Sequence, residues 1–151
     1  MGILDLLLGE KIIKHDAFFG QIESDKTRKK DATKSLNWKI NKRIGPFQND
    51  TFIILEGNHT NINSTQGIEL RNFIENFDAV YAFEIDQLIE SNNSFMKFKN
   101  WRSEYYIAFI CPLFDSNTNF EINFEPIDEK NNDVYFSIEL INRVLKNIAI
   151  L

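Results

Sequence analysis

The sequence predicts an α+β domain in which a mostly antiparallel sheet of about six or seven strands carries one long helix, or two successive helices, on one face. Three segments with β-strand character precede residue 58, and four more follow residue 103. Between them, residues 64–90 carry apolar residues three and four positions apart, which is typical of an amphipathic helix. The predicted order is therefore βββ-α-ββββ. We expect one domain over residues 1–151, because 43% hydrophobic residues can form a sizeable core at this length.

The N-terminal part of the chain is expected to begin with a helix and a first strand. Residues 1–9 are mostly apolar and predict a short helix that packs on the body as a lid. Residues 15–24, HDAFFGQIES, are rich in aromatic residues and predict the first strand. Residues 24–34 are charged and lack periodic apolar positions, so they predict a mobile loop.

Two further strands are expected before the helix. In residues 35–44, Leu36, Trp38 and Ile40 alternate with polar residues, which is the pattern of a strand with one face in water. Residues 51–57, TFIILEG, form a continuous apolar run. Such a run is typical of a strand that is buried on both faces.

The helical insertion at residues 64–90 keeps its apolar positions on one side. These positions are Leu70, Phe73, Ile74, Phe77, Tyr81, Ile85 and Leu88. At about 100° per residue they stay in phase, which predicts one helix or two with a break near residues 76–78. Ser64 or Thr65 is the expected N-cap.

The remaining segments return to β patterns after an aromatic stretch, residues 95–101, that fits no period. Residues 104–112 are apolar on both faces and predict a central strand. Residues 119–126 alternate cleanly, and residues 133–140 are expected to pair with them as a hairpin. Residues 143–151 predict a last strand that follows a turn near Ile141–Asn142.

Composition predicts a cytoplasmic protein. Cys111 is the single cysteine, which fits a reducing compartment, and its apolar surroundings predict an inert core thiol. No segment approaches the roughly 20 apolar residues of a membrane span, so we expect no membrane among its partners. The net charge is −5, but residues 24–45 hold eight basic and two acidic residues, while residues 64–90 hold six acidic residues and one arginine.

The stretch LEGNHTN, residues 55–61, brings Glu56 close to His59, one of two histidines in the chain. A hydrolase or ligand-binding site would need these two side chains to converge in a pocket between helix and sheet, with Glu104 or Tyr105 at its rim. No second histidine or paired cysteines follow, so no metal and no cofactor are expected. The simpler interpretation is a turn that leads from a strand to the helix.

The acidic side chains of the helical insertion are the stronger candidate. Glu75, Asp78, Asp86 and Glu90 are expected to project opposite the apolar stripe, into solvent. Such a face usually carries basic residues at i+4, and here they are almost missing. An unpaired acidic face can steer a basic partner towards the protein. An ordinary solvated helix face is the alternative.

The basic segment, residues 24–45 with Trp38 inside it, is the pattern that a nucleic-acid patch would show. An acidic pI of about 5.1 and the lack of any nucleic-acid-binding motif speak against this function. Lysines on an edge strand also discourage association between sheets. We therefore expect a solvated face and no nucleic acid among the partners.

The order of F-F-G-Q-I, W-K-I and F-I-I-L-E-G, then a helical middle, then hairpins through INFEPIDEKNNDVYFSIELIN, resembles small bacterial domains of unknown function. Some of these are similar to immunity proteins, which are encoded beside toxins. The resemblance implies a protein that binds and blocks a cognate toxin and carries no catalytic residues. In that interpretation the protein is not an enzyme, and its acidic helix face mimics the anionic substrate of a basic toxin or plugs its cleft. A homodimer stays open as an alternative, with a seam formed by the apolar strands 51–57 and 104–112 and the aromatic residues 95–101.

Overall fold

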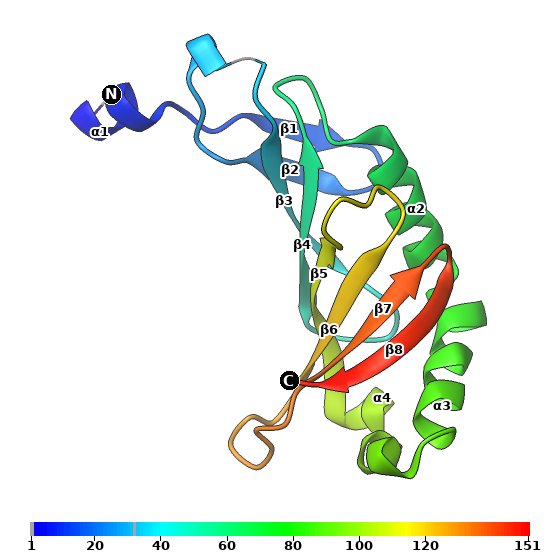
Figure 1. Ribbon diagram of the computed structural model, residues 1–151. Helices are drawn as coiled ribbons and strands as arrows, with labels where there is room; N and C mark the ends of the chain where they lie inside the picture. The colour runs from blue at the N-terminus through cyan, green and yellow to red at the C-terminus, as the bar shows by residue number, and fades with distance from the viewer. Residues whose placement is uncertain (1, 32) are drawn as a thin grey trace.

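The computed structural model describes residues 2–31 and 33–151, with the backbone only for residues 4–6. It is an α+β fold built on one eight-stranded sheet whose strands follow one another in space as they do in sequence (Figure 1). The strands are β1 (Ile13–Asp16), β2 (Gly20–Ser24), β3 (Leu36–Arg43), β4 (Asp50–Gly57), β5 (Tyr105–Pro112), β6 (Phe120–Pro126), β7 (Phe136–Ile141) and β8 (Val144–Ile150).

Every neighbouring pair of strands is antiparallel except β4 and β5, which are parallel. A parallel pair needs a long crossover, and here the helices supply it. The crossover contains α2 (Ser64–Glu75), η2 (Phe77–Tyr81), α3 (Ala82–Glu90), η3 (Asn93–Phe98) and α4 (Trp101–Glu104). The α+β class and the mostly antiparallel sheet expected from the sequence are therefore confirmed.

The sheet has eight strands rather than the six or seven expected, because residues 13–24 form two strands, β1 and β2, joined by a turn, instead of one strand. Asp16 Oδ1 accepts hydrogen bonds from the backbone N–H groups of Phe18 and Phe19, each at 2.8 Å. Gly20 follows with φ +76°, a backbone conformation that glycine adopts without strain. Phe18 and Phe19, which suggested a single strand, thus lie in the turn between β1 and β2, and Phe19 packs into the core.

The helical crossover follows the predicted range, with two differences in detail. The N-cap is Asn63, whose side chain accepts from the N–H groups of Thr65 and Gln66, so the expected cap at Ser64 or Thr65 was wrong. At the predicted break the chain forms the π-helical segment η2. Its wider turn, closed by a bond from Tyr81 N to Asn76 O at 3.4 Å, keeps residues four apart on one face.

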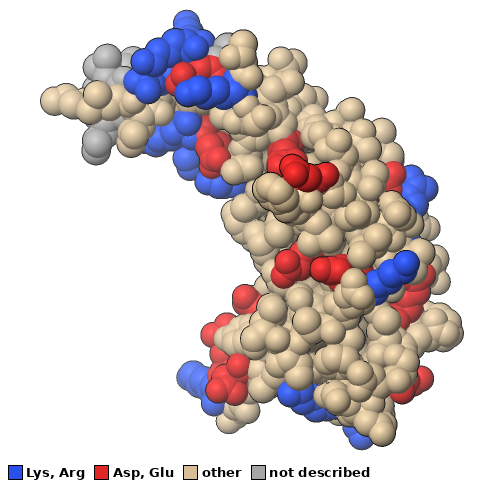
Figure 2. Space-filling model, in the orientation of Figure 1, with Lys and Arg blue, Asp and Glu red and all other residues tan. Residues whose placement is uncertain are grey.

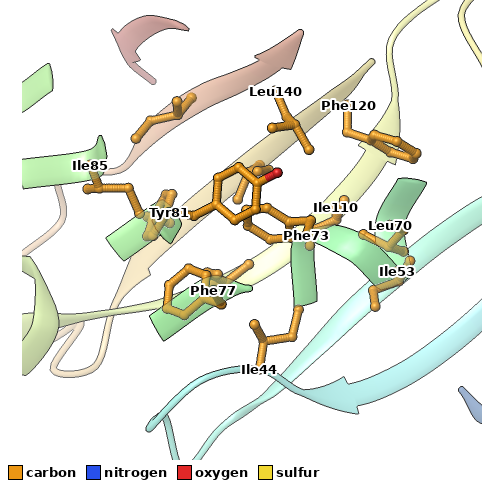
Figure 3. Close-up of a cluster of buried hydrophobic side chains, with 14 of the residues drawn as sticks. Ile44, Ile53, Leu70, Phe73, Phe77, Tyr81, Ile85, Ile110, Phe120 and Leu140 are labelled. Carbon is orange, nitrogen blue, oxygen red and sulfur yellow. The ribbon is translucent and has the colours of Figure 1, made fainter. Parts of the chain in front are cut away.

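The core lies between these helices and one face of the sheet. Figure 3 shows Phe73, Phe77 and Tyr81 from the helices pointing towards strand residues that include Ile53 and Ile110. Neighbouring rings meet mostly edge to face, as between Phe73 and Phe77 at 5.7 Å. The cluster extends to both tryptophans, which are fully buried. This packing is the main source of the stability of the fold.

Two expectations about burial were wrong, and the described side chains of the expected N-terminal lid are exposed. Helix α1 (Ile3–Leu8) forms, but Ile3, Leu7 and Leu8 are exposed, so it does not bury these side chains against the body. Phe98 and Trp101 are core residues, which removes them from any dimer seam. The apolar strands β4 and β5 are buried on one face only, with half-buried side chains on the other.

The expected loop at residues 24–34 begins one residue later, since Ser24 is buried in β2. Its residue 32 lies outside the described part of the chain. The loop contains a short 3-10 turn, η1 (Lys29–Asp31), and Thr27 pairs with Glu10 through two backbone hydrogen bonds of 3.0 Å. Among the described residues, no helix is both long enough and apolar enough to cross a membrane.

Candidate functional site

Half of the six acidic side chains in residues 64–90 have arginine partners. Asp86 accepts two hydrogen bonds from the Arg102 guanidinium, at 2.6 and 2.7 Å, and one from Trp101 Nε1 at 2.9 Å. Glu75 pairs with Arg71 at 2.9 Å. The expectation that these carboxylates lack basic partners was therefore wrong for two of the four. Asp78 and Glu90 are exposed, with no ion pair among the described residues.

The partners of this helix face come from distant parts of the chain. Glu69 forms a two-point pair with Arg143, at 2.7 and 2.9 Å. Burial raises the pKa of Asp86, but the hydrogen bonds from Arg102 and Trp101 outweigh it and leave that pKa lowered. Arg143 likewise lowers the pKa of Glu69. These pairs fasten the helices to α4 and to the turn before β8, so their role is structural.

Glu56 and His59 have separate partners. Glu56 accepts a hydrogen bond from Gln66 Nε2 at 2.7 Å. His59 Nε2 lies 2.9 Å from Thr27 Oγ1, in the loop after β2. A polar hollow of about 610 Å³ at the ends of β4 and α2 includes Glu56 in its lining, but His59 is not among the described lining residues. In the segment LEGNHTN, Glu56 thus contacts the start of α2 and His59 contacts the loop after β2, and the two side chains do not share a pocket among the described residues.

The other residues of the proposed hydrolase pocket also lie apart. Tyr105 is buried in the core, and its hydroxyl accepts a hydrogen bond from Asn132 Nδ2 at 2.7 Å. Glu104 lines a different hollow, beside residues 126–132. Cys111 is half-buried, and burial followed by the charge of Glu121 raises the pKa of its thiol, which disfavours the reactive thiolate. These candidate residues therefore do not come together as a nucleophile and a base.

The face of the sheet opposite the helices is open. Figure 1 shows α2 and α3 on one side of the sheet and no helix over the middle of the other side, and Figure 2 shows the molecule hollowed there. At its centre, on the parallel pair β4 and β5, the rings of Phe52 and Phe109 stack at 5.8 Å with an interplanar angle of 21°. Both side chains are only half-buried. An aromatic pair on an uncovered sheet is a candidate contact surface.

Half-buried glutamates stand beside this pair. Glu121 and Glu125 lie on the open side of β6, because their neighbours in the strand point into the core. Glu139 of β7 is the direct cross-strand partner of Glu121. None of the three forms an ion pair within the described residues. Glu125 accepts a hydrogen bond from the Tyr106 hydroxyl at 3.2 Å, and Glu139 accepts one from Asn147 Nδ2 at 2.6 Å. Lys146 of β8 is the cross-strand neighbour of Glu139 on its other side. Like charges placed directly opposite each other, as in Glu121 and Glu139, destabilise a sheet.

Further acceptors and a shallow hollow complete the open face. Asn123, between the two glutamates of β6, holds a buried Oδ1 atom that has no hydrogen-bond partner in the described structure. On the other side of the aromatic pair, a hollow of about 320 Å³ is lined by Gln21, Glu23 and Lys39, among others. We call the whole surface the open sheet face. Its central residues are Phe52, Phe109, Glu121, Asn123, Glu125 and Glu139.

No group of three or more metal-binding side chains occurs among the residues that the structure describes. Comparisons with protein-family models, with curated proteins and with solved structures find no match. From the sequence, β4 and β5 were expected to contribute only to a dimer seam, and the glutamates of β6 and β7 beside them were not predicted as part of a site. A signal for the open sheet face was present in the sequence. The apolar runs of β4 and β5 indicate a second layer over this face, whereas the regular polar alternation of β6 indicates that no layer covers it.

Proposed function

We propose that this protein is a non-catalytic binding domain that blocks a cognate bacterial toxin, and that it binds the toxin with its open sheet face. The observation that carries the proposal is the stacked pair of Phe52 and Phe109 beside three half-buried glutamates that lack cationic partners in the described structure. Apolar rings and negatively charged carboxylates that share one uncovered face favour a protein partner.

The chemistry of the face favours arginine on the partner. A guanidinium can stack on an aromatic ring and donate two hydrogen bonds to a carboxylate at the same time. The carbonyl of Asn123 would gain a donor in the same contact. A basic toxin therefore fits this surface better than it fits the helix face, where Asp86 and Glu75 already hold arginines.

The direct test is co-expression with the product of the gene adjacent to the one that encodes this chain. We expect a complex with one copy of each protein and restored growth of cells that produce the toxin. The partner's affinity is then measured by isothermal titration calorimetry. A gene product that neither binds this chain nor loses its toxicity contradicts the proposal.

The variants for this titration compare the two acidic surfaces directly. Glu121→Gln with Glu139→Gln removes charge from the open sheet face, and Glu75→Gln with Glu90→Gln removes the same charge from the helix face. We expect the first pair to weaken binding by about tenfold or more. The second pair should change it by less than about twofold. The reverse order would assign the contact to the helix face.

A further inference from the structure

We propose that helix α1 and the loop between β2 and β3 form a docking surface for an anionic lipid membrane. This surface lies apart from the open sheet face, and the inference is independent of the proposed function. It is defined by the exposed apolar residues Ile3, Leu7 and Leu8 and by the basic residues Lys26, Arg28, Lys29, Lys30 and Lys34, and we call it the N-terminal docking surface.

The apolar part of this surface is strongly exposed. Ile3, Leu7 and Leu8 are 81%, 60% and 55% exposed. Ile3 and Leu7 are four residues apart on a helix, so they lie on the same side. Exposed isoleucine and leucine side chains grouped on one short helix, rather than scattered singly, indicate a surface that contacts something apolar.

The basic part lies at the same end of the molecule. Residues 25–35 hold five basic and two acidic residues, a net charge of 5 − 2 = +3. Both acids are engaged, Asp25 with Lys39 at 2.8 Å and Asp31 with Lys34 at 3.1 Å. Lys29 and Lys30 are exposed at the tip of the loop. Figure 2 shows lysine and arginine gathered at this end, where α1 lies in Figure 1.

The fold holds these two parts beside each other. Gly9 ends α1 with φ +82°, and a Cβ atom there would lie 2.0 Å from the carbonyl oxygen of Thr27. The backbone of Glu10 then pairs with that of Thr27 through two hydrogen bonds of 3.0 Å. His59 fixes Thr27 from the other side. The contact at Gly9 therefore positions the apolar helix against the base of the basic loop.

An anionic lipid surface matches both parts at once. Apolar side chains of a short helix enter the boundary between headgroups and acyl chains, while lysines contact the negative headgroups. Each contribution is weak alone, and peripheral proteins commonly combine two such signals. A nucleic acid would use the lysines and leave the isoleucine and leucines without a role. Docking of this kind needs no membrane-spanning segment, so the proposal departs from the expectation, drawn from the lack of such a segment in the sequence, that no membrane is among the partners.

The test is co-sedimentation of the full chain with vesicles. We expect binding to phosphatidylcholine vesicles that contain about 30% phosphatidylglycerol, and no binding to pure phosphatidylcholine. Raising NaCl from about 0.1 M to about 0.5 M should weaken binding by about tenfold or more, because salt screens the lysines. Equal binding to both kinds of vesicle overturns the proposal.

Two pairs of variants separate the contributions. Ile3→Ser with Leu7→Ser, and Lys29→Glu with Lys30→Glu, should each reduce vesicle binding by about tenfold. Matched controls lie elsewhere on the surface. They are Phe114→Ser, at a side chain that is 93% exposed, and Lys97→Glu with Lys99→Glu, at two exposed lysines near η3. The controls should bind vesicles as the unchanged protein does.

The remaining outcomes overturn the inference in distinguishable ways. If the control variants also lose vesicle binding, the interaction is nonspecific and does not depend on the N-terminal docking surface. A concentration-dependent dimer that Ile3→Ser with Leu7→Ser abolishes assigns α1 to a second copy of the chain, and binding of a short RNA without vesicle binding assigns the loop to nucleic acid. Toxin binding by the vesicle-deficient variants should be unchanged, so failure here leaves the proposed function standing.

Discussion

The two faces of the sheet carry similar residues in very different surroundings. On the helix-covered face, Ile53 of β4 and Ile110 of β5 are fully buried beneath the aromatic side chains of the helical crossover. On the open face of the same strands, Phe52 and Phe109 stack on each other and stay half-buried. The covered face is fully packed, whereas the open face keeps half-buried apolar rings beside carboxylates that form no ion pair within the described residues. Packing explains the first face, and we propose a binding partner for the second.

Phe77→Ala tests the covered face and should have the largest effect. Phe77 is 1% exposed and lies between the rings of Phe73 and Trp101. Truncation would leave a cavity, so we expect the free energy of unfolding to fall by about 3–5 kcal/mol. Urea denaturation followed by circular dichroism measures it. A loss below about 1 kcal/mol would mean that the helices are not tightly packed on the sheet.

Asp86→Asn tests how the helical cover is fastened. We expect a loss of about 1–2 kcal/mol at pH 7, because the charged hydrogen bonds from Arg102 and Trp101 weaken and solvent screens part of the pair. The pKa of Asp86 is lowered in the folded protein, so its stabilisation is present above the ordinary value of 3.8. It is lost as the pH falls through the lowered pKa.

The difference between Asp86→Asn and the unchanged protein should therefore shrink as urea titrations are repeated at progressively lower pH. A difference that stays constant down to the most acidic condition would show that the asparagine disturbs packing rather than charge. Arg102→Gln, which removes the other partner, should give a loss of similar size at pH 7.

Phe52→Ala is the counterpart of Phe77→Ala on the open face. Its ring is half-buried and touches Phe109, so truncation should lower the free energy of unfolding by only about 1 kcal/mol. The same urea titration compares the two variants. A loss equal to that of Phe77→Ala would show that the ring belongs to the core and would remove the basis for a binding surface.

Glu121→Gln with Glu139→Gln should have the smallest effect and the opposite sign. Removing two like charges that face each other across strands should raise the free energy of unfolding by about 0.5 kcal/mol. The gain should diminish in high salt. Glu75→Gln is the matched control, because it breaks the pair with Arg71 and should destabilise slightly. Destabilisation by the glutamine pair would give Glu121 and Glu139 a structural role.

The sequence allowed prediction of the parts of the fold that local patterns determine. The apolar period identified the helical crossover and the place of its break, where η2 widens the turn. The alternation in residues 119–126 identified β6. The hairpin of β1 and β2 was not predicted because Phe18 and Phe19 are residue types common in strands. In the structure, the side chain of Asp16 holds them in a turn.

The candidate site depended on contacts that no local pattern contains. The helix carboxylates appeared unpaired because Arg102 and Arg143 lie far along the chain from Asp86 and Glu69. Periodicity shows which side chains of a strand share a face, but not whether another layer covers that face. The open sheet face results from the path of the crossover, which places its helices on one side of the sheet.

The central claim is that the open sheet face, and not the helix face, binds the partner. The most direct measurement is the affinity of the adjacent gene's product for Phe52→Ala combined with Glu121→Gln and Glu139→Gln. This variant should fold stably and bind about 100-fold more weakly than the unchanged protein, while Glu75→Gln with Glu90→Gln binds normally. Unchanged affinity in the open-face variant, with a stable fold, would contradict the account.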